Sequence, residues 1–143
     1  MSSLVAMLAD AVTAELAAGS FSLPFAPQRC YRPRRELREL KELAVTVVPR
    51  SLTLTGGTRT TRNHDIAIDI AVQQKLTDGN DAAMEPLMQL VEELVTFLAR
   101  RRLAATPTAA LMEIANDPIY AVEHLDEQRV FTSVITATYR VMQ

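Results

Sequence analysis

Cys30 and His64 are of the residue types that can form a thiolate–imidazolium pair for nucleophilic catalysis. Neither residue lies in a recognisable catalytic motif, and a lone cysteine is more often a small buried hydrophobic residue. The stretch Gly56-Gly57-Thr58 has the small residues of a phosphate loop, but it lacks the Gly-x-x-x-x-Gly-Lys spacing and a following helix. The sequence therefore predicts neither nucleophilic catalysis nor phosphate binding at these positions.

Histidines and carboxylates gather at two places where a metal site has to be considered. Zinc needs three or four converging ligands. In the first group, His64 and Asp65 are neighbours, and neighbours in a strand face opposite sides. Asp65 and Asp69 share a face but lie about 13 Å apart along a strand, so we expect them to be solvated or to contact another subunit. The second group is His124 with Glu123 and Asp126; we predict no metal and no cofactor at either place.

Alternating apolar residues predict the strands that position these side chains. The clearest case is 64–75, where every second residue from Ile66 is apolar, the pattern of a half-buried strand. The apolar stretch 43–48 predicts a central strand, which Pro49 closes or makes irregular. The remaining predicted strands are 111–115, 119–124 and 129–142, with a turn at 125–128 between the last two.

Two helices complete the expected fold. Residues 3–18 read as a helix that Ser2 or Ser3 caps and Gly19 ends. Residues 81–102 carry an apolar stripe at three- and four-residue steps, which predicts a long amphipathic helix. We therefore predict a single domain over 1–143 of α+β class, with a mostly antiparallel sheet of four to five strands, an N-terminal helix and one long amphipathic helix packed on it.

Two segments are predicted to lie outside this core. Residues 20–42 contain three prolines and read as an extended basic arm or as the start of a long first strand. Residues 50–63 are mostly polar and read as an exposed loop, or as a hairpin tip around Gly56-Gly57. No apolar run reaches the roughly 18 residues that a membrane span needs, so we expect no membrane contact.

Charge is unevenly distributed along the chain, although the net charge is only −2. Residues 1–62 carry nine basic and five acidic groups, whereas residues 63–143 carry six basic and twelve acidic groups. Segregated charge of this kind favours contact between copies, with the basic part of one copy against the acidic part of the next. Such a contact is heterologous and closes into a ring when the rotation fits. The candidate interaction residues are Arg29, Arg32, Arg34, Arg35, Arg38, Arg59 and Arg62 on the basic side, and Glu113, Glu123, Asp126 and Glu127 on the acidic side.

Two other functions remain open from the sequence. The segment 29–41 has six basic and two acidic residues and, with 100–102, could bind nucleic acid in a strongly salt-dependent way. The isoelectric point near 5.7 argues against a dedicated nucleic-acid binder. A small enzyme with a pocket between helix and sheet would need converging polar groups, which the sequence does not identify.

The order and lengths of these elements resemble those of the small tail-terminator and head–tail joining proteins of long-tailed bacteriophages and their prophages. The matching features are a short N-terminal helix, an Arg-rich approach to 43–49, a polar loop, the strand 64–75, the helix 82–102 and closing strands that end at 136–141. The resemblance covers most of the chain in architecture and size.

This resemblance implies an α/β sandwich with a mostly antiparallel sheet and a structural, non-enzymatic role. It implies a ring, commonly a hexamer, that caps the tail tube, with tail-tube and neck or connector proteins as partners. It also implies a place in the virion tail or neck after assembly in the bacterial cytoplasm. Contact with DNA is possible but not favoured.

The charge asymmetry yields a first prediction. Replacing both Arg34 and Arg35 by Glu should weaken self-association at low salt, because the basic segment then repels the acidic surface of the neighbouring copy. Light scattering at low and high ionic strength measures the effect. An assembly that is unchanged at low salt would remove this segment from the contact.

Overall fold

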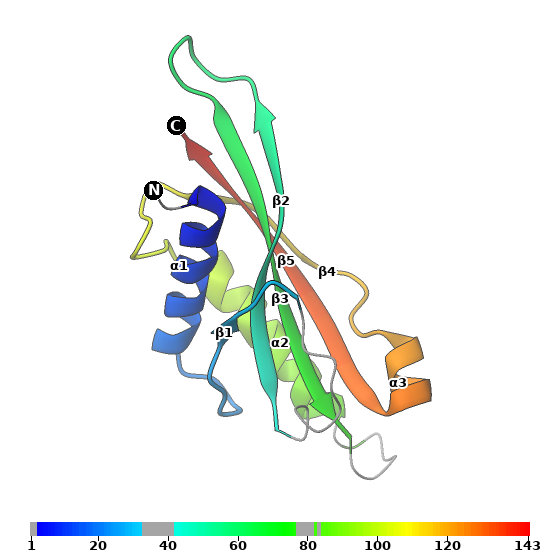
Figure 1. Ribbon diagram of the computed structural model, residues 1–143. Helices are drawn as coiled ribbons and strands as arrows, with labels where there is room; N and C mark the ends of the chain where they lie inside the picture. The colour runs from blue at the N-terminus through cyan, green and yellow to red at the C-terminus, as the bar shows by residue number, and fades with distance from the viewer. Residues whose placement is uncertain (1–2, 33–41, 77–81, 83) are drawn as a thin grey trace.

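The computed structural model describes residues 3–32, 42–76, 82 and 84–143 (Figure 1). Its five-stranded sheet has the order β1-β2-β3-β5-β4, in which only β1 pairs in parallel and all other neighbours are antiparallel. The predicted α+β class and mostly antiparallel sheet are therefore confirmed. The elements are α1 (Leu4–Ala18), β1 (Gln28–Arg29), β2 (Ala44–Thr55), β3 (Asn63–Lys75), α2 (Met84–Ala99), β4 (Ala110–Asn116), α3 (Val122–Gln128) and β5 (Val130–Met142).

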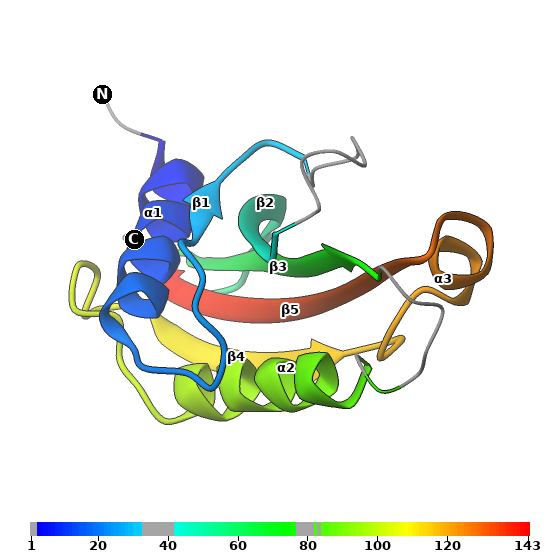
Figure 2. The same cartoon turned by 90° about the horizontal axis from the view of Figure 1, so that it is seen from below.

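The core lies between the helices and one face of the sheet. Figures 1 and 2 show α1 beside β1 and β2, and α2 beside β4 and β5. The alternating apolar residues of β3 point into this core, and each of them is fully buried. They share one cluster with buried side chains of both helices, so both helices cover the same face. These residues are Ile66, Ile68, Ile70 and Val72.

Both predicted helices form. The Ser3 hydroxyl accepts a hydrogen bond from Ala6 N at 3.3 Å, which caps α1, and Gly19 N donates to Leu16 O at its other end. The apolar stripe of α2 is buried, and each leucine in it contributes about 2 kcal/mol of hydrophobic free energy. This helix ends at Ala99, earlier than the predicted end at 102.

The predicted strand at 119–124 and turn at 125–128 are wrong. Residues Val122–Gln128 form α3, and Arg129 ends this helix in the left-handed conformation. The segment is rich in good helix formers, including Glu123 and Leu125, whereas the alternation of Ile119 and Ala121 that suggested a strand is too short to decide. This end of the sheet therefore has one strand fewer than predicted, and the acidic residues of this segment lie on a helix.

The predicted loop at 50–63 is shorter in the structure. Strand β2 continues to Thr55, and β3 begins at Asn63, so only residues 56–62 form the hairpin loop. The register shifts between Pro49 and Ser51, which is the irregularity expected at the proline. The pairing resumes beyond this bulge because the threonines and leucines at 52–55 suit a strand.

The described part of the predicted arm packs on its own domain. Phe21 lies 5.1 Å from Phe97 of α2 between ring centroids and 5.3 Å from Phe25. Ser22 N donates to the Glu93 carboxylate at 2.8 Å, and this bond lowers the pKa of Glu93. Residues 20–32 are therefore not a free arm, because aromatic side chains gain more by covering the core than by staying in solvent. Within the described residues, no helix combines the length and apolar character needed to cross a membrane.

A buried carboxylate joins α1 to the chain that follows α2. Glu15 is only 5% exposed and accepts hydrogen bonds from Arg101 Nε at 3.1 Å and from Ala104 N at 2.7 Å. Tyr139 of β5 is also buried, and its hydroxyl has no hydrogen-bond partner among the described residues. Burial, with a smaller contribution from the Glu15 charge, raises the pKa of Tyr139 to about 12. Ionisation of this phenol therefore works against folding.

Tyr139 yields a prediction about alkaline pH. Its pKa is about 12 in the folded chain, against 10.0 in the reference state, so its share of stability is full below pH 10 and is lost as the pH rises toward 12. Tyr139→Phe should remove this pH dependence and, at neutral pH, leave the chain equally stable or up to about 1 kcal/mol more stable, since it deletes an unpaired buried hydroxyl. Urea unfolding from neutral to alkaline pH measures both. Identical alkaline losses in the two chains would contradict the assignment.

Candidate interaction surfaces

One side of the sheet ends in a projecting basic strand and loop, which we call the hairpin edge (residues 50–62). Strand β1 pairs only with Thr46 and Val47, so within the described chain no strand covers β2 beyond that point. The side chains of Leu52 and Leu54 are 49% and 59% exposed, which is unusual for large apolar residues in a strand. The charged side chains of this edge are Arg50, Arg59 and Arg62, and no acidic residue lies within it.

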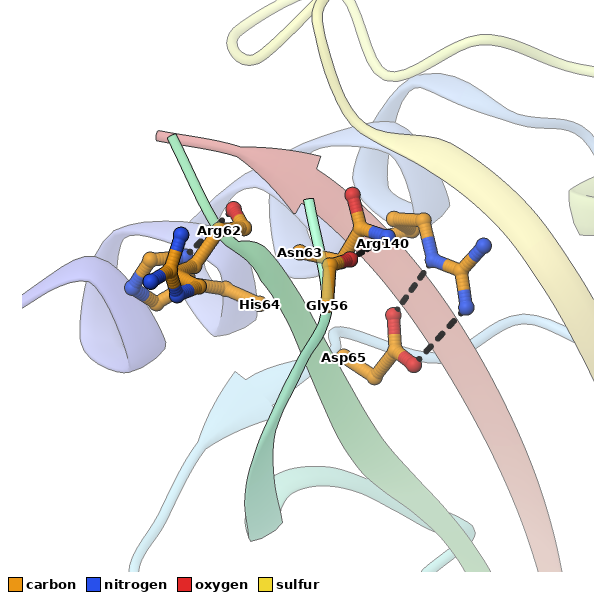
Figure 3. Close-up of polar contacts among 6 residues, drawn as sticks. All are labelled: Gly56, Arg62, Asn63, His64, Asp65 and Arg140. Carbon is orange, nitrogen blue, oxygen red and sulfur yellow. Dashed lines mark hydrogen bonds and ion pairs between the residues drawn. The ribbon is translucent and has the colours of Figure 1, made fainter. Parts of the chain in front are cut away.

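The loop of the hairpin edge has a defined conformation. Arg62 Nη1 donates to Thr58 O at 2.7 Å and to Thr61 O at 3.1 Å, which holds the loop closed. Asn63 Nδ2 donates to Gly56 O at 2.6 Å across the neck of the loop (Figure 3). The backbone of Arg62 also exchanges two hydrogen bonds of 3.0 Å with Gln143. The loop thus has a defined shape, and the positive charge of Arg62 stays at its edge.

Asp65 lies on the face of the sheet opposite the helices, which we call the outer face, and is paired within the chain. It receives two hydrogen bonds from Arg140 on β5, at 2.8 and 3.0 Å (Figure 3). The guanidinium holds the pKa of Asp65 below its ordinary value. From the sequence we expected Asp65 to be solvated or to contact another subunit. The sequence could not identify Arg140 as its partner, because this pairing depends on strand register.

Asp69 has partners of the same kind. It accepts a hydrogen bond from Thr136 Oγ1 at 2.7 Å and lies 3.5 Å from Arg50 Nη1. It also stands directly opposite Thr136 in the register of β3 and β5. The polar outer face therefore binds the hairpin to β5, which keeps the hairpin edge rigid.

The opposite side of the sheet carries the acidic residues, on a surface that we call the acidic edge (residues 110–128). It consists of β4, the connection that follows it and α3, and it contains no Lys or Arg. Glu113 is exposed on β4, and Glu123 and Asp126 are exposed on α3; Glu127 lies in the same helix. Three large apolar side chains are also about half exposed here: Met112, Ile119 and Val122.

The two edges cannot meet within one copy of the chain. Strands β3 and β5 separate β2 from β4, so the free side of β2 at 50–55 and the free side of β4 face in opposite directions. The loop 56–62 lies near the end of β5 and α3 lies at its beginning, and these 13 residues of strand span about 40 Å (Figure 1). Any attraction between the two edges therefore acts between separate molecules.

The other basic candidates have mixed outcomes. Arg29 lies in β1, where it forms an ion pair with Asp10 of α1 and stacks over the Tyr31 ring at 5.1 Å. Arg32 is exposed. Arg34, Arg35 and Arg38 lie outside the described residues, so their role in a contact stays a prediction.

The structure does not assemble the chemical groups considered from the sequence. Cys30 N donates to Val47 O, and Val47 pairs with Ile70, six residues or about 20 Å along β3 from His64. His64 and Asp65 point to opposite sides of their strand (Figure 3). Among the described residues, no three His, Cys, Asp or Glu side chains lie close enough together to hold a metal ion.

Two hollows lie on the surface of the described chain. A cleft of about 720 Å³ lies between residues 23–28 and the start of β2, and Glu42 is the one titratable residue among its described lining residues. A more open groove of about 630 Å³ runs along α2, and its charged lining residues are Glu92, Glu93, Arg100 and Arg101. Two of these side chains, Glu93 and Arg101, are bonded within the chain, to Ser22 and Glu15. The described lining residues of the two hollows do not identify a reaction.

Comparison with known proteins adds no family assignment. No protein-family model matches the chain, and no curated protein is significantly similar to it. The function therefore has to be inferred from the two edges. The sequence found their charges and the exposure of 50–63, but it did not identify 50–55 as a strand. The signal available was the alternation of leucine with threonine at 52–55, which continues the strand past Pro49.

The loop of the hairpin edge yields a prediction with a built-in control. A Cβ atom added at Gly57 would lie 2.5 Å from Thr61 O, whereas one added at Gly56 would meet nothing within 4 Å. Gly57→Ala should therefore open the loop and speed hydrogen exchange of the Arg62 and Gln143 amides by about tenfold or more, while Gly56→Ala leaves it unchanged. Hydrogen exchange followed by NMR measures both variants. Equal exchange in the two would contradict a closed loop.

Proposed function

We propose that the chain is a structural, non-catalytic protein of long-tailed bacteriophages or prophages, of the tail-terminator or head–tail joining type, which assembles from copies of itself into a ring. The element order that resembles this family supports the proposal, and the mostly antiparallel sheet agrees with the fold that the resemblance implied. The observation that carries the proposal is the placement of opposite charges on opposite edges of one rigid sheet.

Opposite edges make the contact between copies directional. The hairpin edge of one copy faces the acidic edge of the next. In an open row, the copies at the two ends therefore each have one unused edge. Such a heterologous contact continues until it closes, and the fixed angle between the edges of the sheet sets the number of copies. A hexamer is the ring size that the resemblance implies.

The two edges combine apolar and charged groups in the way that stable interfaces require. Leu52 and Leu54 on one side, and Met112, Ile119 and Val122 on the other, supply apolar area that is exposed in the single chain. The surrounding charges guide the approach and select the register, while the buried apolar groups supply most of the affinity. In this proposal the mechanism of the protein is assembly.

Surfaces outside the ring contacts would meet the other tail components. We place the working protein in the virion tail or neck, after assembly in the bacterial cytoplasm. The nucleic-acid alternative loses support because two of its cations, Arg29 and Arg101, are engaged by Asp10 and Glu15.

The proposal predicts a discrete oligomer by size-exclusion chromatography with light scattering, formed by the chain alone or on addition of purified tail-tube protein. Arg59→Glu should weaken this assembly about tenfold at low salt, because it places like charges in the contact. Arg102→Glu makes the same charge change at an exposed position away from both edges and serves as the control.

Three outcomes would count against the proposal. One is a chain that stays monomeric with and without tail-tube protein. Another is an assembly that Arg59→Glu and Arg102→Glu weaken equally. The third is tight, salt-sensitive binding of duplex or single-stranded DNA by a monomer, which would favour the nucleic-acid alternative instead.

A further inference from the structure

We propose that copies of this chain join by extending their β-sheets, with the free part of β2 in one copy pairing antiparallel with β4 of the next. This inference rests on the proposed self-assembly and specifies its chemistry. The contact would consist of main-chain hydrogen bonds between two strand edges, flanked by the exposed side chains of those two strands.

The first support is the exposure of both strand edges. Natural proteins protect free edges with Lys, Pro, bulges or covering segments, because an open edge recruits another strand. Residues 50–55 of β2 contain no Lys, Pro or Gly, and neither does β4. Within the described chain, no further strand pairs with either edge. A bulge lies at the start of each free stretch, between Pro49 and Ser51 on β2 and between Leu111 and Glu113 on β4, and leaves regular strand at 51–55 and 113–116.

The second support is that the two free edges lie at the same level of the sheet. The register of the four antiparallel strands can be read across from β2 through β3 and β5 to β4, and the free stretches share three rows. Neighbouring copies can therefore stand side by side with a shift of only a few residues. The rows are Thr53–Asp65–Arg140–Ala110, Leu52–Ile66–Tyr139–Leu111 and Ser51–Ala67–Thr138–Glu113.

The third support is strand direction. From β2 to β4 the chain direction reverses three times, so β2 and β4 run in opposite senses. Copies arranged around an axis roughly parallel to the strands keep the same orientation, which places β4 of one copy antiparallel to β2 of the next. Antiparallel addition is the more stable form of pairing per residue. The resulting sheet would continue from copy to copy without a change of pattern.

The backbone hydrogen bonds also identify which groups face the open edge of β2. Arg62 and Gln143 exchange both of their N–H···O=C bonds, so Arg62 faces β5. Facing alternates along an antiparallel strand, and the next residue of β3 therefore faces β2. The same alternation directs the N–H and C=O groups of Leu52 and Leu54 away from β3, while those of Thr53 point toward it.

The backbone groups alternate in the same way on the other side of the sheet. Along β5 from Gln143, Thr138 faces β4, where it stands opposite Glu113. Ile114 follows Glu113, so its N–H and C=O groups face outward. Each edge thus offers outward N–H and C=O groups at known residues. A proline at such a residue removes the outward N–H without breaking the bonds inside the sheet.

A pair of substitutions at Leu52 tests the main-chain contact. Leu52→Pro removes an outward N–H and the apolar side chain, whereas Leu52→Thr removes only the apolar side chain. We expect Leu52→Pro to abolish assembly at concentrations where the unaltered chain is fully assembled, and Leu52→Thr to keep it with reduced affinity. Light scattering measures assembly, and thermal unfolding shows that each variant is folded.

A mixing experiment tests the direction of the contact. Leu52→Pro keeps an intact β4 edge, and Ile114→Pro keeps an intact β2 edge, with Ile114→Ala as the control for the lost side chain. Each proline variant alone should be monomeric, and their equimolar mixture should form one-to-one dimers and nothing larger. If Ile114→Pro does not fold, the two Leu52 variants still decide the question.

The outcomes separate this inference from the proposed function. An oligomer that Leu52→Pro leaves intact, or that both Leu52 variants weaken equally, overturns edge pairing but leaves self-assembly standing. If the chain is monomeric and requires the Leu52 N–H only for binding tail-tube protein, this edge binds that partner, and pairing between copies is overturned. A chain that is monomeric under all conditions overturns both proposals.

Discussion

The alternation of β3 is the constraint on which the rest of the structure depends. Its four large apolar residues face the helices and are fully buried, which fixes the face that the core occupies. Because the period of a strand is two, a shift of one residue against either neighbour would expose all of them. The register of β2 and β5 on β3 is therefore strongly determined, and the position of every outer-face residue follows from it.

Hydrogen bonds on the outer face hold the strands in this register. Asp65 and Asp69 cannot point into the core without losing hydration, and the same register that buries the isoleucines brings Arg140 and Thr136 opposite them. These bonds tie β3 to β5 on the face of the sheet opposite the helices. A projecting hairpin held in this way can present a defined edge, whereas a loose loop would lose conformational entropy on binding.

The proposed assembly uses what the fold leaves uncovered. Two helices cover one face, yet neither outer strand is fully paired along its length within the described chain. Charge segregation, exposed leucines and open main-chain groups coincide at these edges. Each of the three is ordinary alone, but their coincidence on opposite edges of one sheet is what a directional contact between identical molecules needs.

The sequence by itself determined the elements whose patterns are long and regular: α1 between Ser3 and Gly19, the stripe of α2, and the alternation of β3 and β5. It also determined the separation of charge, which depends on composition alone. It misjudged α3, because a two-residue alternation cannot outweigh helix propensity, and it read residues 50–55 as a loop, because its polar and apolar residues alternate too briefly after Pro49.

Only the tertiary structure decided which residues stand opposite one another. Long-range register brought Asp65 to Arg140, placed Glu15 under Arg101, packed the expected arm on α2 and kept Cys30 far from His64. It also showed that the basic and acidic segments lie on opposite edges of one sheet. No local pattern contains this information, since it arises from strand order and from the pairing of residues more than 60 positions apart.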